Sequence, residues 1–231
     1  TEKVYVNKIN IFGNNITSEE FIRNNLIVDE GDPFNKILHN KSLNKLRSKG
    51  IFTKVDSKIV DTNDNTLKDI ELIIEEKPTG EIMAGAGYGT DGTTFSVGIK
   101  ENNFNGKGIV LESNLSLTEE SIKGFITYEH PNFRYSDRAL ATSLEVTDTD
   151  KLSNFGYKSS TNAISLGTRY EQFANTFFSP KLSISSESLE TNKDASDAYK
   201  KQEGSYFDTS FGYGLTYDRR NSAYQPSAGF Y

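Results

Sequence analysis

One glycine-rich stretch, residues 81–90 with the sequence EIMAGAGYGT, constrains the fold most because it separates two different periodic patterns. The residues before it show a mixed α/β pattern. The residues after it alternate with a period of two to the end of the 231-residue chain, without a helical pattern. Pro78 has no backbone N–H and a fixed φ, so it suits the exit of a strand better than its interior. We therefore expect a domain over residues 1–77, a hinge over residues 78–80 with Pro78 and Gly80, and an all-β unit over residues 81–231.

The glycine-rich stretch itself is predicted to be a strand with one bare face. Alternate side chains point to opposite sides of a strand, so Gly85, Gly87 and Gly89 share one face. Glycine packs no side chain and loses much conformational entropy when it is ordered, which makes such a strand weak. The pattern fits a seam that opens, and it fits equally a bend or a close backbone approach at a barrel corner. A dinucleotide-binding loop is disfavoured because it needs glycine where Thr90 stands and a helix after it.

Composition excludes several classes of function. The net charge of −6 and the pI of about 5.1 disfavour a nucleic-acid partner. The chain has no cysteine, which removes disulfides, thiol catalysis and thiolate metal sites. Mean hydropathy is only −0.58 although the chain holds 15 Phe and 12 Tyr, a combination that suits strands in which every second residue is polar. No run of 18 apolar residues could form a membrane helix, but a membrane β-strand needs only about 9–11 alternating residues.

The first 77 residues predict the order β-α-α-β-β. A β-rich run over residues 4–12 ends at a Gly-Asn turn, and Thr17 and Glu20 have capping-box spacing for a helix over residues 18–25. Asp32-Pro33 has the pattern of an N-cap followed by proline, so a second helix is expected from there to about Lys49. Gly50 is the expected left-handed residue after this helix. Two strands, residues 51–60 and 67–76, complete the segment.

This order, with a set of turn glycines and apolar anchors, resembles a POTRA domain. The resemblance implies a periplasmic module that guides client polypeptides by strand addition at a sheet edge. The residues that carry it are Gly13, Asn14, Gly31, Phe34, Leu46, Gly50 and Phe52.

From residue 81 onward the alternation predicts eight antiparallel strands with one apolar, often aromatic face and one polar face. A soluble β-sandwich would alternate in the same way. Connection lengths favour a membrane barrel, because short connections (90–93, 103–108, 118–121) and long polar ones (148–160, 190–205) both occur. Short turns are expected to face the periplasm. The predicted lipid-facing residues are Leu111, Leu115, Leu144, Leu166 and Tyr213, and the predicted lumen-facing residues are Glu112, Glu145, Gly167 and Gly212.

Three further segments resemble the outer-membrane β-barrel assembly (BamA) family: NNFNGKG at 102–108, YEHPNF at 128–133, and YDRRN at 217–221 with YQPSAG at 224–229. The resemblance implies a POTRA domain joined to an antiparallel transmembrane β-barrel, here truncated to about eight strands, with residues 228–231 starting a ninth. It implies non-enzymatic insertion of β-barrel proteins into the bacterial outer membrane, with the first domain in the periplasm. Expected partners are unfolded outer-membrane protein clients, outer-membrane lipids and accessory assembly lipoproteins. Clients would pair with the first barrel strand at Ile82, Met83, Ala84, Gly85, Ala86, Gly87 and Tyr88.

The alternatives are a polypeptide-exporting barrel of the same superfamily and a passive outer-membrane channel or lipase. A lipase would need Ser, His and a polar orienting group to converge, and the candidates are Ser136 with His130. The other histidine, His39, falls in a helical pattern. The acidic run 61–65 lacks the glycine and glutamate of a calcium-binding loop. We expect no enzyme, no cofactor and no metal site.

Overall fold

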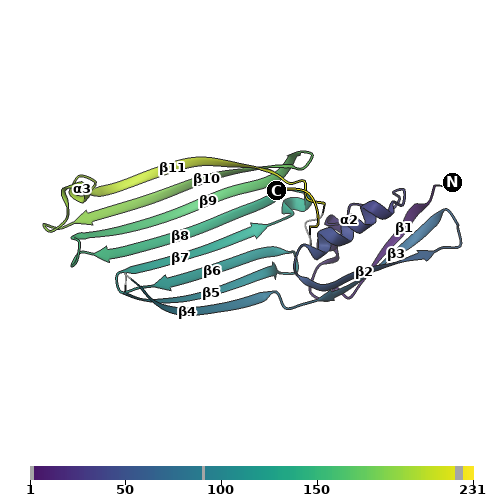
Figure 1. Cartoon of the computed structure of the whole chain (residues 1–231), viewed down its shortest axis with the longest axis horizontal. Coiled ribbons are helices and arrows are strands. Elements are labelled where there is room, and N and C mark those ends of the chain that lie inside the picture. Colours follow the sequence, from purple (N-terminus) through teal and green to yellow (C-terminus); the bar gives the residue numbers. More distant parts are fainter. Residues whose placement is uncertain (1–2, 90–91, 222–225) are drawn as a thin grey trace.

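The computed structural model describes residues 3–89, 92–221 and 226–231, which form an N-terminal α+β domain beside a large antiparallel sheet (Figure 1). In the N-terminal domain β1 pairs parallel with β3, and β2 pairs antiparallel with β3, giving the sheet order β1-β3-β2. The predicted order β-α-α-β-β is therefore confirmed. Its elements are β1 (Tyr5–Phe12), α1 (Glu19–Asn24), α2 (Lys36–Arg47), β2 (Phe52–Asp61) and β3 (Leu67–Glu76).

The two helices of this domain begin at other residues than the capping patterns predict. Ser18, not Thr17, caps α1, and its Oγ accepts a hydrogen bond from the Phe21 amide at 3.2 Å. The predicted Asp32-Pro33 start of α2 is also wrong, because Pro33 forms an extended bridge with Tyr5. The helix begins at Lys36 after Asn35, whose side chain accepts from the amides of residues 37 and 38.

The core of the N-terminal domain lies between the helices and the three-stranded sheet. Gly50 follows α2 with a φ of +70°, as predicted for the residue that reverses the chain. The buried side chains come from both helices and all three strands, so the domain has a hydrophobic core of its own. They are Val6, Ile9, Phe21, Ile22, Val28, Leu43, Leu46, Ile51, Phe52, Val55, Ile70, Leu72 and Ile74.

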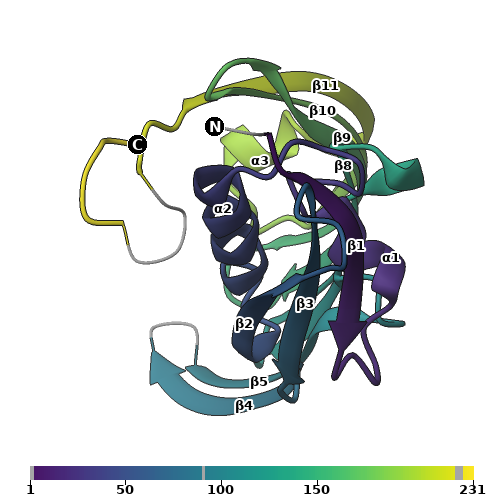
Figure 2. The same ribbon diagram turned by 90° about the vertical axis from the view of Figure 1, so that its right-hand side faces the viewer.

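The second unit is one eight-stranded antiparallel sheet in which each strand pairs with its neighbours in sequence. The sheet is curved but not closed, with β4 and β11 at its edges (Figure 2). The predicted eight strands are confirmed. None of the described helices is long and apolar enough to cross a membrane. The strands are β4 (Gly80–Gly89), β5 (Gly92–Phe104), β6 (Ile109–Leu117), β7 (Ser121–His130), β8 (Ala139–Lys151), β9 (Tyr157–Phe173), β10 (Thr176–Thr191) and β11 (Gly204–Tyr217).

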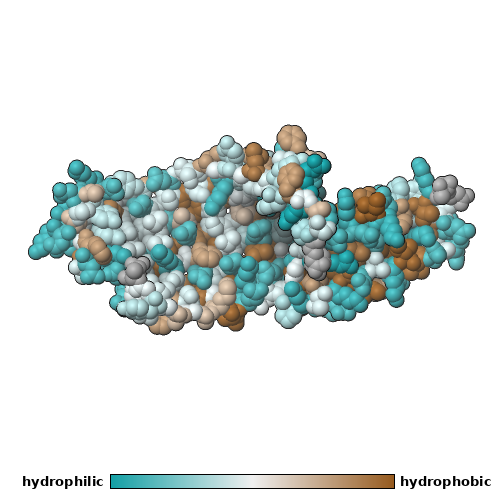
Figure 3. All heavy atoms as spheres, viewed as in Figure 1, coloured by the Kyte–Doolittle hydropathy of each residue, from teal (hydrophilic) through white to brown (hydrophobic). Residues whose placement is uncertain are grey.

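Pairing register separates the side chains of this sheet into an apolar and a polar face, because directly paired residues point to the same side. One continuous row across seven strands is Ile82, Ile99, Ser113, Ile126, Leu144, Ile164 and Ile184. The five predicted lipid-facing residues share the face of this row, and the four predicted lumen-facing residues lie on the other. Viewed toward the concave side, the sheet is mostly hydrophilic to intermediate in colour (Figure 3). The apolar face is therefore the convex one.

The short and long connections are not divided between the two ends of the sheet as predicted. The short turn at residues 118–120 lies at the end of the sheet far from the N-terminal domain, opposite the short turn at 105–108. The predicted turn 90–93 includes residues 90 and 91, which lie outside the described residues. The predicted long loop 148–160 is wrong, because β8 and β9 stay paired as far as Lys151 and Tyr157. Between β10 and β11 the chain forms the short helix α3 (Asp197–Lys200).

The predicted ninth strand is also not formed. Residues 226–231 fold back instead, so that Arg219 and Asn221 donate backbone hydrogen bonds to the carbonyls of Phe230 and Ala228, both at 2.9 Å. Residues 222–225, which include part of the YQPSAG segment, lie outside the described residues.

Candidate functional site

All seven predicted pairing residues, 82–88, lie in β4, which is an edge strand. Its sheet partner is β5, and its ten residues are all exposed. Ile82 and Tyr88, on the apolar face, are 84% and 87% exposed. An exposed edge presents unpaired backbone N–H and C=O groups, which is a template for pairing with another strand.

The polar face of β4 is nearly bare of side chains. A Cβ built on Gly87 or Gly89 would meet no atom within 4 Å, whereas one on Gly85 would lie 3.0 Å from the Ser96 Oγ of β5. The long side chains on this face, Glu81 and Met83, precede the three glycines, and the Cε of Met83 lies 3.2 Å from the position that a Cβ on Gly98 would take. The strand is thus held to β5 mainly by its backbone ladder, with few side-chain contacts to reinforce it.

The predicted hinge joins β3 to β4 through a connection that is anchored at both ends. The Lys77 amide donates to the Ile51 carbonyl at 3.3 Å. The Thr79 carbonyl accepts two hydrogen bonds of 3.2 Å, one from the backbone amide of Asn102 and one from its side chain. Gly80 already belongs to β4 and pairs with Glu101. These contacts leave Pro78 as the residue between the two anchors.

A second connection between the two units is made by the turn between β5 and β6, residues 103–108, which we call the docking turn. The Ser18 amide donates to the Gly106 carbonyl at 2.8 Å. The buried Asn103 side chain donates to the Thr17 hydroxyl at 2.9 Å, and its Oδ1 accepts from the Gly108 amide at 2.8 Å. The start of α1 is therefore hydrogen-bonded directly to the large sheet.

Two glycines allow this close approach. Gly106 and Gly108 have φ values of +68° and +62°, a backbone conformation that glycine adopts without penalty. A Cβ on Gly106 would lie 2.1 Å from the carbonyl oxygen of Ile16, and one on Gly108 would lie 2.1 Å from the Phe21 ring. The sequence analysis used this segment as a short turn and for its family resemblance, but did not predict that it contacts the N-terminal domain. In the structure it seats the N-terminal domain on the sheet.

Glu76 holds the loop before α1 in the position that the docking turn needs. Its carboxylate accepts hydrogen bonds from the amides of Asn15, Ile16 and Thr17 at 2.9, 2.9 and 2.6 Å. Burial opposes ionisation of this carboxyl, but the hydrogen bonds outweigh burial and lower the pKa of Glu76 below its ordinary value.

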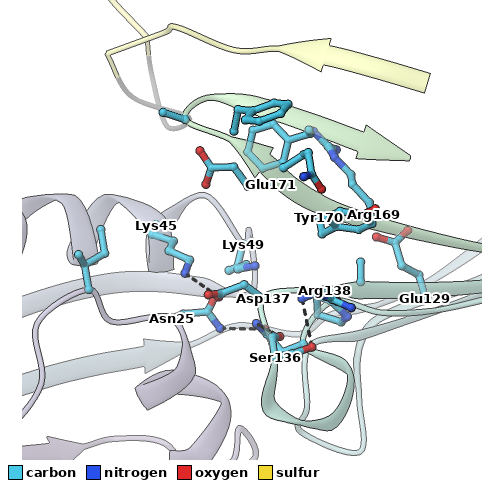
Figure 4. Close-up of a pocket in the computed structure, with 18 residues that line it drawn as sticks. Asn25, Lys45, Lys49, Glu129, Ser136, Asp137, Arg138, Arg169, Tyr170 and Glu171 are labelled. Atoms are coloured by element: carbon cyan, nitrogen blue, oxygen red, sulfur yellow. Dashed lines mark hydrogen bonds and ion pairs between the residues drawn. The ribbon is translucent and has the colours of Figure 1, made fainter. Parts of the chain in front are cut away.

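A groove of about 950 Å³ separates α2 from the near ends of β7–β10 (Figure 4). Two contacts cross between the units beside it. The Asn25 side chain donates to Asn132 Oδ1 at 3.4 Å, and Lys45 lies 3.9 Å from Asp137. Lys49 also lines the groove, where burial and the neighbouring Lys45 lower its pKa. Both contacts are long, so the docking turn is the stronger attachment.

The residues considered for catalysis do not converge. Ser136 Oγ donates to the Phe133 carbonyl at 2.6 Å, and the His130 ring packs edge-on against the Phe133 ring with centroids 5.9 Å apart. His39 lies 2.7 Å from Ser57 Oγ on β2, and burial lowers its pKa. Within residues 3–89, 92–221 and 226–231, no group of three or more His, Asp or Glu side chains is placed to hold a metal ion.

A βααββ domain docked on a sheet with an apolar convex face and a polar concave face defines a POTRA-containing membrane β-protein. A family model described as "Omp85 superfamily domain" matches residues 80–231, and a POTRA model described as "Surface antigen variable number repeat" matches residues 4–77. The chain belongs to the Omp85 superfamily. It is a protein of the bacterial outer membrane whose POTRA domain lies in the periplasm.

Several relatives and solved structures are similar to the chain. It is 29% identical over 133 residues to the outer membrane protein assembly factor BamA of Neisseria meningitidis serogroup B, and 30% identical over 109 residues to that of Nitratidesulfovibrio vulgaris. These matches cover 57% and 46% of the chain but only 17% and 14% of the relatives. The crystal structure of Haemophilus ducreyi BamA lacking POTRA domains 1–3 aligns with 98% of the chain and 46% of that structure, at 25% identity and a TM-score of 0.71. CdiB from Acinetobacter baumannii shares the fold over 93% of the chain and 42% of its own, at 17% identity and a TM-score of 0.62.

Proposed function

We propose that the chain is part of a non-enzymatic factor that assembles β-barrel proteins and inserts them into the outer membrane. The observation that carries this proposal is the glycine face of β4, where a Cβ on Gly87 or Gly89 would meet no atom and the strand is held mainly by its backbone ladder. The names of the BamA relatives support outer-membrane protein assembly as the activity. In this proposal residues 1–77 are the periplasmic unit, residues 78–80 the hinge and residues 81–231 the membrane unit.

Strand pairing at β4 is the mechanism that the geometry favours. A client strand added to the free edge would satisfy backbone groups that the bilayer cannot satisfy, which makes pairing favourable without a nucleotide or a cofactor. The bare face at Gly87 and Gly89 contributes few contacts, so one partner strand exchanges for another with little net loss of side-chain packing. The N-terminal domain would deliver clients along the exposed edge of β2 by the same type of pairing. Accessory lipoproteins of the periplasm and outer-membrane lipids complete the proposed set of partners.

Polypeptide export through the polar lumen is the second candidate. The fold alone does not decide between the two, because the chain shares it with solved structures of both BamA and CdiB. Site-directed crosslinking separates the two. This chain has no cysteine, so a single cysteine placed at each of positions 82–88 in the full-length protein reports one contact at a time. Assembly predicts crosslinks to the last strand of a stalled barrel client. Export predicts crosslinks from lumen-facing positions such as Glu145 instead. Crosslinks from β4 only to the protein's own closing strand, with the client shown to be bound, would reject pairing at β4.

The glycines provide a matched pair of substitutions. Gly87→Val adds a side chain in open space on the polar face, so it strengthens β4 by up to about 1 kcal/mol and should slow client insertion. Gly85→Val places its Cβ near Ser96 Oγ, so part of the gain is lost to crowding. We expect slower insertion with Gly87→Val than with Gly85→Val, measured as the folding rate of a client in vesicles that contain the full-length protein. Unchanged or faster insertion with both variants would reject the idea that the bare glycine face eases the exchange of strands.

A further inference from the structure

A hollow of about 480 Å³ lies beside the connection between β7 and β8, at the end of the sheet that carries the POTRA domain. Figure 2 shows this connection projecting from the convex side of the sheet. Leu140 and Thr168 pair directly and face the same side as Leu144 and Leu166, so the floor of the hollow continues the apolar face. The lining residues are Phe133, Arg134, Ser136, Arg138, Ala139, Leu140 and Thr168.

Two exposed guanidinium groups border this hollow. Arg134 lies over the Phe133 ring at 5.5 Å, and Arg138 lies over the Tyr170 ring at 5.2 Å. Among the residues that the structure describes, no carboxylate lies within ion-pair distance of either guanidinium. Stacking on an aromatic ring leaves the N–H donors at the edge of the guanidinium plane free for an anion.

The connection holds the two arginines in fixed positions four residues apart. The Phe133 amide donates to the Arg138 carbonyl at 2.9 Å and closes the loop. Inside it, the hydroxyl of Ser136 donates to the Phe133 carbonyl at 2.6 Å and accepts from the Arg138 amide at 3.3 Å. Arg134 has a φ of +52°, which is uncommon for arginine and is imposed by this closed loop. An anion would therefore bind to donors that are already ordered.

The arginines also lie at the level where the membrane meets water. Tyr170 packs against Phe178 with ring centroids 5.9 Å apart, and Phe178 packs against Tyr213 at 6.1 Å. All three rings are on the apolar face at the periplasmic end of their strands. Such an aromatic row marks the interface of a membrane β-sheet. The donors of Arg134 and Arg138 therefore lie at headgroup depth in the periplasmic leaflet.

We propose that this hollow binds an anionic glycerophospholipid of the periplasmic leaflet. Its phosphate would lie between Arg134 and Arg138, because a guanidinium matches phosphate with paired, charge-assisted hydrogen bonds. One acyl chain would lie on Leu140 and the apolar face beyond it at Leu144 and Leu166. The free positive charges select an anionic headgroup, and the apolar floor requires a lipid rather than a soluble phosphate ester. This site is independent of client pairing at β4.

Native mass spectrometry of the delipidated full-length protein in detergent tests the site. The probes are phosphatidylglycerol, phosphatidylcholine with the same acyl chains, and the soluble headgroup glycerophosphoglycerol. The test variant is Arg134→Gln/Arg138→Gln. The matched control is Lys41→Gln/Lys58→Gln, which also removes two exposed positive charges but from the POTRA domain. Heat-modifiable electrophoretic mobility verifies that each variant is folded.

We expect wild type and control to retain phosphatidylglycerol in preference to phosphatidylcholine. Loss of one guanidinium contact of about 1.4 kcal/mol corresponds to tenfold weaker binding, so the double Gln variant should lose at least an order of magnitude. Arg134→Lys/Arg138→Lys keeps both positive charges but removes the paired donors of the guanidinium groups, so it should bind phosphatidylglycerol with intermediate strength. This variant replaces the Gln variant in the test if the Gln variant does not fold. Unchanged phosphatidylglycerol retention in either test variant, an equal loss in the control, or equal binding of the soluble headgroup would overturn the proposal.

Discussion

Leu144→Arg is the substitution that best tests how the large sheet is oriented. Leu144 lies at the middle of β8 on the apolar face, paired with Ile126 on one side and Ile164 on the other. If this face meets lipid, an arginine here sits near the bilayer midplane and costs about 2–4 kcal/mol of folding free energy. That cost corresponds to about a 30-fold to 700-fold change in the folding equilibrium.

The neighbouring substitution Glu145→Arg is its matched control. Glu145 is exposed on the polar face of the same strand, opposite Phe125 and Ala163, and no described cation forms an ion pair with it. An arginine here is solvated by the lumen, so we expect a cost of about 0.5 kcal/mol. The control changes the charge by two units and the test variant by one, so a purely electrostatic cost would make the control the worse variant.

Reversible urea unfolding of the full-length protein in lipid vesicles measures both costs. The two variants should unfold with similar m-values, because they expose the same surface, and should differ in midpoint. Equal losses of free energy on the two faces would refute the assignment of the convex face to lipid. A larger loss for Glu145→Arg than for Leu144→Arg would reverse it.

Three further predictions concern the POTRA domain and its docking. Asn103→Ala leaves the Thr17 hydroxyl and the Gly108 amide without these partners, so the docking of the POTRA domain on the sheet should weaken by about 1–3 kcal/mol. Hydrogen exchange should then accelerate at residues 103–108, while exchange in β11 stays unchanged. The pKa of Glu76 is lowered in the folded protein, so its carboxylate stabilises the fold at neutral pH. This stabilisation is lost as the pH falls from the ordinary pKa of 4.5 through the lower pKa of the folded state. Glu76→Gln should therefore be less stable than wild type at pH 7, and the difference in stability should disappear in acid. Residues 1–77 have their own core and should unfold cooperatively as an isolated monomer in a circular-dichroism melt, and an unfolded spectrum at room temperature would reject that boundary.

Periodicity predicts the strands and their faces because register ties each strand to the next. A one-residue slip would move every apolar side chain of a strand to the polar face, so the alternation around Leu144 or Leu166 leaves a single consistent pairing. The same signal misplaces strand ends. Residues 148–151 and 158–160 are polar, yet they stay in the ladder, because loss of apolar character marks the edge of the apolar band rather than the end of hydrogen bonding.

Helix starts and the docking turn depend on contacts that are distant in sequence. Thr17 and Ser18 are both good capping residues. Ser18 caps the helix because the Thr17 hydroxyl already accepts a hydrogen bond from the side chain of Asn103, which lies 86 residues further along the chain. Asp32-Pro33 has a strong local signal for a helix start, but the bridge to Tyr5 keeps the chain extended. Local propensity is a weak prior where tertiary partners compete for the same groups.

The attachment of the POTRA domain and the free edge of β4 belong to one arrangement. The Thr79 carbonyl, bound twice by Asn102, fixes the first residues of β4 at its periplasmic end. The docking turn fixes the next two strands to the start of α1. The glycines that leave one face bare follow further along β4, from Gly85 onward. The start of β4 is therefore held by its neighbour β5, and β5 and β6 are held by the N-terminal domain, while the pairing of β4 depends mainly on its backbone groups. Under the proposed function, a strand built in this way would accept partners of many sequences at one place, as a template for diverse β-barrel clients requires.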